Sequence, residues 1–391
     1  MSIKQQFHFS SATCGFKKSR KPDLAVIYSG VSCTYSGVFT LNQVRAACVD
    51  ENELLLKRRK KIRAIVVNSG NANACTGKQG LNAVKKTKQI TAKLLKIKPD
   101  EILVASTGVI GVQLDMEKME NGLHSALLGL SPQNLKSAAR AILTTDRFVK
   151  IASKKTKDFF LEGFTKGAGM IHPNMATMLC FFMTDLKMPQ ELMQTALKSA
   201  VDVSFNNISV DGDMSTNDMV ILLSNNQSKP EIKTAVDPLY KKFAETLKEL
   251  CIKLAKHIVI DGEGAKRLIN IKVLNARSVN DAKEIARSVS SSVLFKCAIY
   301  GSDPNWGRAA ARIGCTNVQI EPEKIDIFLN KTQVYKKGSP VKFNRVKLHK
   351  QIKKSKEVKV TVNLNLGNKS ASAFGCDLSY DYVKLNSAYF T

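Results

Sequence analysis

Apolar residues recur along the chain in two patterns, and each predicts a different kind of element. Short, nearly continuous apolar runs bounded by glycine, proline or charged residues predict buried β-strands. These runs cover residues 23–29, 35–40, 62–67, 102–106, 178–183 and 268–274. Apolar positions at helical spacing predict amphipathic helices over residues 78–97, 115–130, 133–143, 189–206 and 237–257. The chain therefore alternates predicted strands with predicted helices.

The last part of the chain gives a weaker pattern. Residues 318–364 alternate short apolar segments with basic turns, which predicts short strands. Residues 375–391 carry an apolar-rich pattern that predicts a terminal strand. A chain end is frayed by default, so this density of apolar residues favours a docked tail.

Residues 166–185 combine a glycine-rich half with an apolar half. Pro173 and the glycines predict a tight, non-helical approach to the strand at 178–183. Ala176 and Thr177 place a small residue and a hydroxyl at the entrance of that strand. This arrangement suits a self-cleaving N-terminal nucleophile, in which Thr177 attacks the preceding carbonyl and its freed amine becomes the base. Taken alone, an Ala-Thr pair more commonly marks an ordinary strand start.

The charge is strongly basic, with 60 Lys and Arg against 33 Asp and Glu and a net charge of +27. Such an excess fits a protein that binds nucleic acid or anionic membranes, and residues 57–61 form its densest run. However, the lysines are spread over the whole length, and no basic module with interleaved aromatic residues occurs. A solvated, lysine-rich surface is therefore favoured, with neither nucleic acid nor membrane as a partner.

The nine cysteines are scattered and form no Cys-x-x-Cys pair. This usage indicates a reducing compartment rather than a disulfide framework or a zinc ribbon. The five histidines show no metal-ligand spacing. Residues 1–8 lack the apolar core of a signal peptide, and the longest apolar run is too short to span a bilayer. We expect a soluble, cytoplasmic protein without a metal.

Six further strings narrow the function. They are NSGNANACTG at 68–77, STGVIG at 106–111, KGAGMIHPNMATML at 166–179, SFNNISVDGDMSTND at 204–218, DGEGA at 261–265 and DPNWGR at 303–308. Together they resemble the ornithine acetyltransferase family, bifunctional glutamate N-acetyltransferases of arginine biosynthesis. The order and spacing of the strings agree too, and the resemblance runs from about residue 15 to residue 391.

The resemblance implies roles for individual residues. Thr177 would be both the nucleophile and the residue after the cleaved bond to Ala176, while Thr107 and Gly108 would form the oxyanion hole. One such donated hydrogen bond typically lowers a barrier by about 3–4 kcal/mol. The implied substrate-binding residues are Thr144 or Thr145, Lys166, Thr177, Glu263, Asn386 and Thr391. No metal or cofactor is required, and DPNWGR is expected to serve packing or an interface.

The implied architecture is the α/β fold of this family and its aminopeptidase relatives, with mixed sheets sandwiched between helices. Residues 1–176 would become an α chain and residues 177–391 a β chain, which the family assembles as an α2β2 heterotetramer. The implied reaction is a ping-pong transfer of acetyl from N2-acetylornithine to glutamate through Thr177. Whether acetyl-CoA also serves as donor stays open, because the family includes both types.

Two positions depart from the family pattern. The element that begins at Thr144 continues with Arg147 and lacks the usual proline, which puts the shape of this loop in doubt. Asn207 replaces the usual arginine, so any charge role there is lost. The carboxylates of residues 204–218 suggest a calcium loop, but glycine and glutamate are not at EF-hand positions.

Two other functions stand as alternatives. A related aminopeptidase or amidohydrolase would use the same nucleophile with water as acceptor, and would release acetate from acetylornithine. A basic nucleic-acid-binding protein would instead bind DNA in a salt-dependent way as an intact chain of 43.0 kDa.

Overall fold

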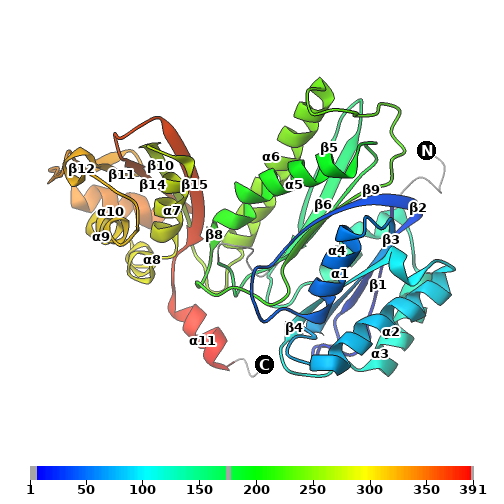
Figure 1. Ribbon diagram of the computed structural model, residues 1–391. Coiled ribbons are helices and arrows are strands. Elements are labelled where there is room, and N and C mark those ends of the chain that lie inside the picture. The colour runs from blue at the N-terminus through cyan, green and yellow to red at the C-terminus, as the bar shows by residue number, and fades with distance from the viewer. Residues whose placement is uncertain (1–6, 173–177, 389–391) are drawn as a thin grey trace.

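The computed structural model describes residues 7–172 and 178–388, which form two α/β units joined side by side (Figure 1). The larger unit is built on an eight-stranded sheet and the smaller one on a seven-stranded sheet. Both sheets contain parallel and antiparallel pairs. The expected α/β fold with mixed sheets and flanking helices is therefore confirmed.

The larger sheet has the strand order β4-β3-β2-β9-β7-β6-β5, and β1 pairs with β2 beside this path. Its strands are β1 (Phe7–Ala12), β2 (Leu24–Phe39), β3 (Ile62–Asn71), β4 (Ile102–Val109), β5 (Lys150–Lys155), β6 (Phe160–Lys166), β7 (Leu179–Thr184) and β9 (Met219–Ser224). The pairs β3–β4 and β7–β9 are parallel. The long strand β2 pairs first with β3 and then with β9, so it joins the two halves of the sheet.

The halves of this sheet pack face to face. One core cluster combines side chains of β1–β4 with side chains of β6, β7 and β9, and the rings of Phe9 and Phe164 meet at 6.5 Å between them. Outside, α2 (Gly77–Leu95) and α3 (Met116–Leu128) cover one half, while α5 (Gln190–Asp202) and α6 (Pro238–Ile260) cover the other. The helices α1 (Ala47–Lys57) and α4 (Leu135–Ala141) contribute to the central core.

Strand β7 is apolar at nearly every position because both of its faces are buried. Cys180 and Phe182 point toward α5 and α6, whereas Leu179, Phe181 and Met183 enter the central core. The continuous apolar run at 178–183 thus predicted a buried strand correctly. The proposed cleavage would separate β6 from β7, which are paired neighbours.

The smaller sheet has the order β13-β12-β11-β14-β10-β15-β8. Its strands are β8 (Ile208–Ser209), β10 (Leu268–Ala276), β11 (Asp326–Leu329), β12 (Thr332–Lys336), β13 (Ser339–Pro340), β14 (Glu357–Asn363) and β15 (Lys369–Cys376). Its helices are α7 (Val279–Ser290), α8 (Val293–Tyr300), α9 (Trp306–Gly314) and α10 (Arg345–Lys354). The Trp306 ring stacks on Tyr335 with centroids 4.9 Å apart, so this part of DPNWGR serves packing, as expected.

Short 3-10 helices occupy Pro99–Glu101, Pro132–Asn134, Phe205–Asn207 and Pro322–Lys324. The last helix, α11 (Tyr380–Ala388), leaves the smaller sheet and returns toward the larger unit (Figure 1). The predicted terminal strand is therefore wrong for these residues. Tyr380, Val383 and Leu385 are 81%, 61% and 49% exposed, so their apolar character reflects no buried strand face.

Part of the pattern at 318–364 was also misread. Residues 345–354 form helix α10 rather than a strand, because Leu348 and Ile352 are buried one helical turn apart under a basic exposed face. The nine cysteines are all free. None of the helices within residues 7–172 and 178–388 combines the length and the apolar character that crossing a bilayer requires.

Candidate active site

The proposed oxyanion residues lie at the carboxyl end of β4, where it runs beside β3. Thr107 pairs with Ser69 and Gly108 with Gly70 in the parallel ladder. Gly108 has φ +135°, and a Cβ there would lie 2.3 Å from the carbonyl carbon of Gly70. Only glycine can occupy such a position, because the backbone of β3 fills the space that a side chain needs. The strings 68–77 and 106–111 therefore form one backbone-rich surface.

Asn217 fixes this surface from the string 204–218. Its side-chain amide donates to the carbonyl oxygens of Ala72 at 2.7 Å and Ser106 at 2.9 Å. The Ser106 hydroxyl in turn bonds to Asn68 at 2.7 Å. Three strings that are distant in sequence thus meet at the ends of β3 and β4.

Lys166 reaches the same place from the end of β6. Its Nζ donates to the Thr107 hydroxyl oxygen at 3.1 Å, although the lysine is only 3% exposed. An ammonium group can only donate, so the Thr107 hydroxyl accepts this bond and keeps its own proton for another acceptor. That free donor is what an oxyanion hole requires.

Burial governs the ionisation of Lys166. Burial lowers the pKa of its ammonium group, and the nearby charge of Lys150 acts in the same direction. The carboxylates of Asp146 and Glu263 oppose this change. Lys166 therefore gives up its proton more easily than a solvated lysine.

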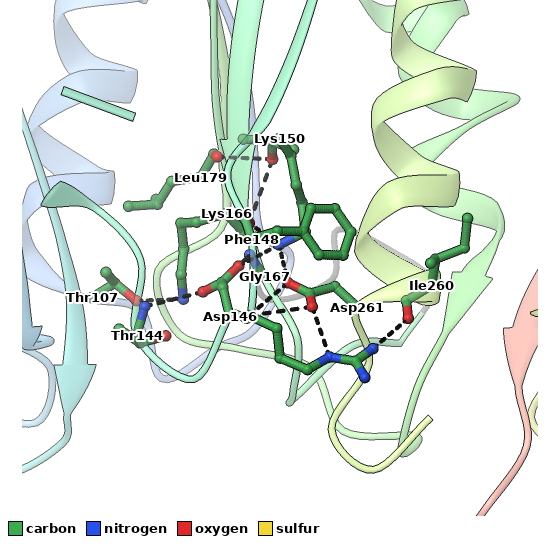
Figure 2. A network of polar contacts seen from close by, with 12 residues as sticks. Thr107, Thr144, Asp146, Phe148, Lys150, Lys166, Gly167, Leu179, Ile260 and Asp261 are labelled. Atoms are coloured by element: carbon green, nitrogen blue, oxygen red, sulfur yellow. Dashed lines mark hydrogen bonds and ion pairs between the residues drawn. The ribbon is translucent and has the colours of Figure 1, made fainter. Parts of the chain in front are cut away.

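Asp146 holds the predicted substrate loop against β6 (Figure 2). Its carboxylate accepts hydrogen bonds from the backbone N–H of Thr144 at 3.0 Å, the N–H of Gly167 at 2.7 Å and Lys150 Nζ at 2.7 Å. Burial alone would raise the pKa of Asp146, but the charges of Lys166 and Lys150 and the Gly167 N–H outweigh it and lower the pKa to about 2. The carboxylate is thus ionised, and it fixes Thr144 next to the residue after Lys166.

A buried ion network continues from this loop to the end of α6 (Figure 2). Lys150 lies between Asp146 and Asp261, and all three side chains are inaccessible to solvent. Arg147 donates hydrogen bonds to the Asp261 carboxylate from its backbone N–H and from its Nε, the latter at 3.0 Å. Its Nη2 also donates to the carbonyl of Ile260 at 2.7 Å. Arg147 thus adds a second cation to Asp261, while Lys150 keeps its contacts with both Asp146 and Asp261.

Glu263 enters the site from the loop after α6. Its backbone N–H donates to the carbonyl of Ala168 at 2.9 Å, which joins DGEGA to the chain just after Lys166. Gly169 leaves room for the Glu263 carboxylate, because a Cβ there would lie 2.7 Å from it. From α11, Asn386 Nδ2 donates to Glu263 Oε2 at 2.9 Å. The predicted pair of substrate residues is therefore in direct contact.

Two aspartates of the string 204–218 hold the chain on either side of residues 173–177. Asp211 accepts the N–H groups of Met170 at 2.6 Å and Ile171 at 2.8 Å. Asp218 accepts the N–H of Met178 at 2.8 Å. The described residues contain no group of three or more His, Cys, Asp or Glu that could hold a metal ion. These aspartates anchor backbone.

Most of the site predicted from sequence is brought together by the fold. Thr107, Gly108, Thr144, Lys166, Glu263 and Asn386 lie around the exits of β4 and β6. Thr145 follows Thr144 in the same loop, and no side-chain hydrogen bond to another residue within 7–172 and 178–388 distinguishes its role. Ala176, Thr177 and Thr391 lie outside the described residues. Sequence reasoning missed Lys150 and Asp261, and it considered Asp218 only as a possible calcium ligand; all three are buried.

We expect the Asp261→Asn variant to lower the free energy of unfolding by about 3 kcal/mol, because it leaves Lys150 buried with less compensation. Chemical denaturation of wild-type and variant protein measures this difference. The matched control is Asp158→Asn, which removes the partner of the partly exposed Lys242. A pair in that setting contributes about 1 kcal/mol or less. Equal losses in the two variants would contradict a structural role for the buried network.

Comparisons with known proteins identify the family of this chain. The model of the ArgJ family matches residues 8–391. The arginine biosynthesis bifunctional protein ArgJ of Thermotoga neapolitana is 44% identical over 401 residues, covering 100% of both chains. The protein of that name from Caldanaerobacter subterraneus is 42% identical and covers 100% of this chain and 98% of its own.

A solved structure is also similar. The crystal structure of the arginine biosynthesis bifunctional protein ArgJ from Bacillus halodurans shares 38% identity, with a TM-score of 0.51. The match covers 52% of this chain and 96% of the crystal chain. The present chain belongs to the ArgJ family.

Proposed function

We propose that this protein transfers an acetyl group from N2-acetylornithine to glutamate in arginine biosynthesis, in the cytoplasm. Family membership and the names of the relatives support a bifunctional acetyltransferase of this pathway. The observation that carries the chemistry is the bond from buried Lys166 to Thr107, which leaves a hydroxyl donor beside Gly108. The donor pair lies at the end of β4, and Lys166, which reaches it from the end of β6, precedes the proposed nucleophile at position 177 by eleven residues.

We propose that the chain first cuts itself between Ala176 and Thr177. The crystal chain from Bacillus halodurans supports this proposal. The match covers 96% of that chain but only 52% of the present one, as expected if the crystal chain is one piece of a cut protein. The sheet order also accommodates a cut, because β7 and β9 lie between β2 and β6 and stay paired on both sides. The buried network of Lys150 and Asp261 would further hold the α and β chains together. Two such αβ pairs would associate into an α2β2 heterotetramer.

Acetyl transfer then proceeds in two halves. The Thr177 hydroxyl attacks the acetyl carbonyl of N2-acetylornithine, and the Thr177 amine takes the hydroxyl proton and passes it to the departing amine of ornithine. Glutamate next attacks the acetyl-threonine ester, and the same amine receives and returns the proton. In both halves the Thr107 hydroxyl and the Gly108 N–H would donate to the oxyanion. These steps require no metal and no cofactor.

Charged and amide groups around this position suit amino-acid substrates. The Glu263 carboxylate, oriented by Asn386, would bind a substrate ammonium group. Thr144 or Thr145, Lys166 and Thr391 would hold the remaining polar groups. The net charge of +27 favours the approach of anionic glutamate.

Incubation with N2-acetylornithine and glutamate tests the proposal. We expect ornithine and N-acetylglutamate in equal amounts, with parallel-line kinetics for a covalent acetyl intermediate. Ornithine release without glutamate, accompanied by acetate, would contradict the proposal and favour a hydrolase. Replacing N2-acetylornithine by acetyl-CoA in a parallel reaction determines whether that donor is also used.

A further inference from the structure

Asp218 is a buried carboxyl group that the transfer reaction does not use. It lies directly before β9 and is 1% exposed. Its Oδ1 accepts the N–H of Met178 at 2.8 Å, and its backbone carbonyl accepts the N–H of Thr40. Its Oδ2 is buried and has no hydrogen-bond partner among the residues that the structure describes. An unpartnered buried oxygen is costly, so its presence requires an explanation.

Protonation of the Asp218 carboxyl group explains why its Oδ2 can be buried without a hydrogen-bond partner. Burial raises the pKa of Asp218 well above its usual value, and the Met178 N–H, the charge of Lys166 and the nearby hydroxyl and N–H of Ser215 only partly oppose this effect. Lys166, from β6, is the charged side chain that acts on this carboxyl group. A neutral carboxylic acid accepts through its carbonyl oxygen and donates through its hydroxyl. Because Oδ1 accepts from Met178, the proton belongs on Oδ2.

Asp218 is thus hydrogen-bonded to Met178, the residue that follows the proposed nucleophile. Met178 is bonded to Thr177, and consecutive backbone nitrogens are three bonds apart, within about 4 Å whatever the conformation. Asp218 contacts the second of these two nitrogens directly. The first, the amide nitrogen of residue 177, becomes an amine when the chain is cut, and it must gain a proton.

We propose that Asp218 is the general acid of self-cleavage and protonates the amide nitrogen of residue 177. This inference rests on the proposed function. The Thr177 oxygen bonds to the carbonyl carbon of Ala176, the bond from that carbon to nitrogen breaks, and the nitrogen takes the Asp218 proton. The hydroxyl proton of Thr177 returns to Asp218. Water then hydrolyses the ester, which releases the carboxylate of Ala176 and restores the hydroxyl.

Neighbouring groups fit this role less well. Asp211 is committed to backbone, since its two oxygens accept the N–H groups of Met170, Ile171 and Asp213. Lys166 donates to Thr107. The His172 ring lies near the Ser209 hydroxyl, and burial lowers its pKa, which favours the neutral imidazole, whose remaining N–H is a very weak acid. Asp218 alone among these carboxyl groups holds a proton without an acceptor in the described part of the chain.

The Asp218→Asn variant tests the proposal, because asparagine keeps an acceptor for Met178 but cannot give up a proton. Precursor made by cell-free translation is followed over time on a denaturing gel, with thermal unfolding as the check on folding. We expect cleavage to be at least about 100-fold slower than in wild type. The matched control is Asp185→Asn at the other end of β7, where a buried carboxyl group accepts the N–H of Phe160 at 2.9 Å. This control should cleave at close to the wild-type rate.

The pH dependence separates an acid from a structural anchor. The wild-type cleavage rate should decline on the alkaline side as Asp218 ionises, and folded Asp218→Asn should lose this decline. Wild-type-rate cleavage by the folded variant overturns the inference. If the variant does not fold, the wild-type profile decides, and a rate without an alkaline decline overturns it. A wild-type chain that never cleaves would instead contradict the proposed function itself.

Discussion

The Thr177→Ala variant should remain a single chain of 43.0 kDa and lose acetyl transfer. Alanine lacks the hydroxyl that attacks the preceding carbonyl, and an uncut chain has no free amine to act as base. Removing a nucleophile of this kind lowers turnover by about 10⁴-fold or more. A denaturing gel with N-terminal sequencing, together with the transfer assay, measures both effects.

Thr177→Ser is the informative control, because it keeps a hydroxyl at the same position. It should still give two pieces, residues 1–176 and 177–391, with the second beginning at the serine. Thr184→Ala, at the far end of β7, should cleave normally although it removes a hydroxyl bound to the Phe160 carbonyl at 2.6 Å. Efficient cleavage of Thr177→Ala would contradict the mechanism, and so would full transfer activity in an uncut wild-type chain.

Local sequence patterns predicted correctly those helices and strands whose burial follows one pattern from end to end. The apolar run at 178–183 is read correctly because β7 is covered on both faces. The strands expected at 23–29 and 35–40 are in fact one strand, β2. The residues between them, 30–34, mix small, polar and apolar side chains where β2 passes from β3 to β9, and that exchange of partners is set by distant residues.

The residues of the candidate site also fall into two groups, those located from the sequence and those that only the tertiary structure reveals. Thr107, Lys166 and Glu263 were located because their strings resemble motifs of the family, in which glycines and polar residues mark loops. The pairing of Lys150 with Asp261 joins positions 111 residues apart, so no local pattern could predict it. The burial of Asp218 also depends on tertiary packing, and its string alone suggested only a metal loop.

The Gly108→Ala variant should also lose most of the transfer activity, because an alanine side chain does not fit at this position. Gly108→Ala would place its Cβ 2.3 Å from the carbonyl carbon of Gly70 and 2.5 Å from the nitrogen of Asn71, both of them backbone atoms. The end of β4 must therefore shift, and this shift displaces both proposed oxyanion donors, the Thr107 hydroxyl and the backbone N–H of residue 108. Because a displacement of about 1 Å can cost about 100-fold in rate, we expect kcat/KM to fall by at least that factor. The positive φ adds about 1–3 kcal/mol of strain.

Gly111→Ala separates the steric effect from the strain. Gly111 lies just beyond the same strand with φ +81°, but a Cβ there would meet nothing within 4 Å. Its variant should lose about 1–2 kcal/mol of stability from the left-handed backbone and keep transfer activity within a few-fold of wild type. Thermal unfolding and transfer kinetics on both variants measure the contrast. Equal activity of the two would mean that the close contact of β4 with β3 does not position the oxyanion donors.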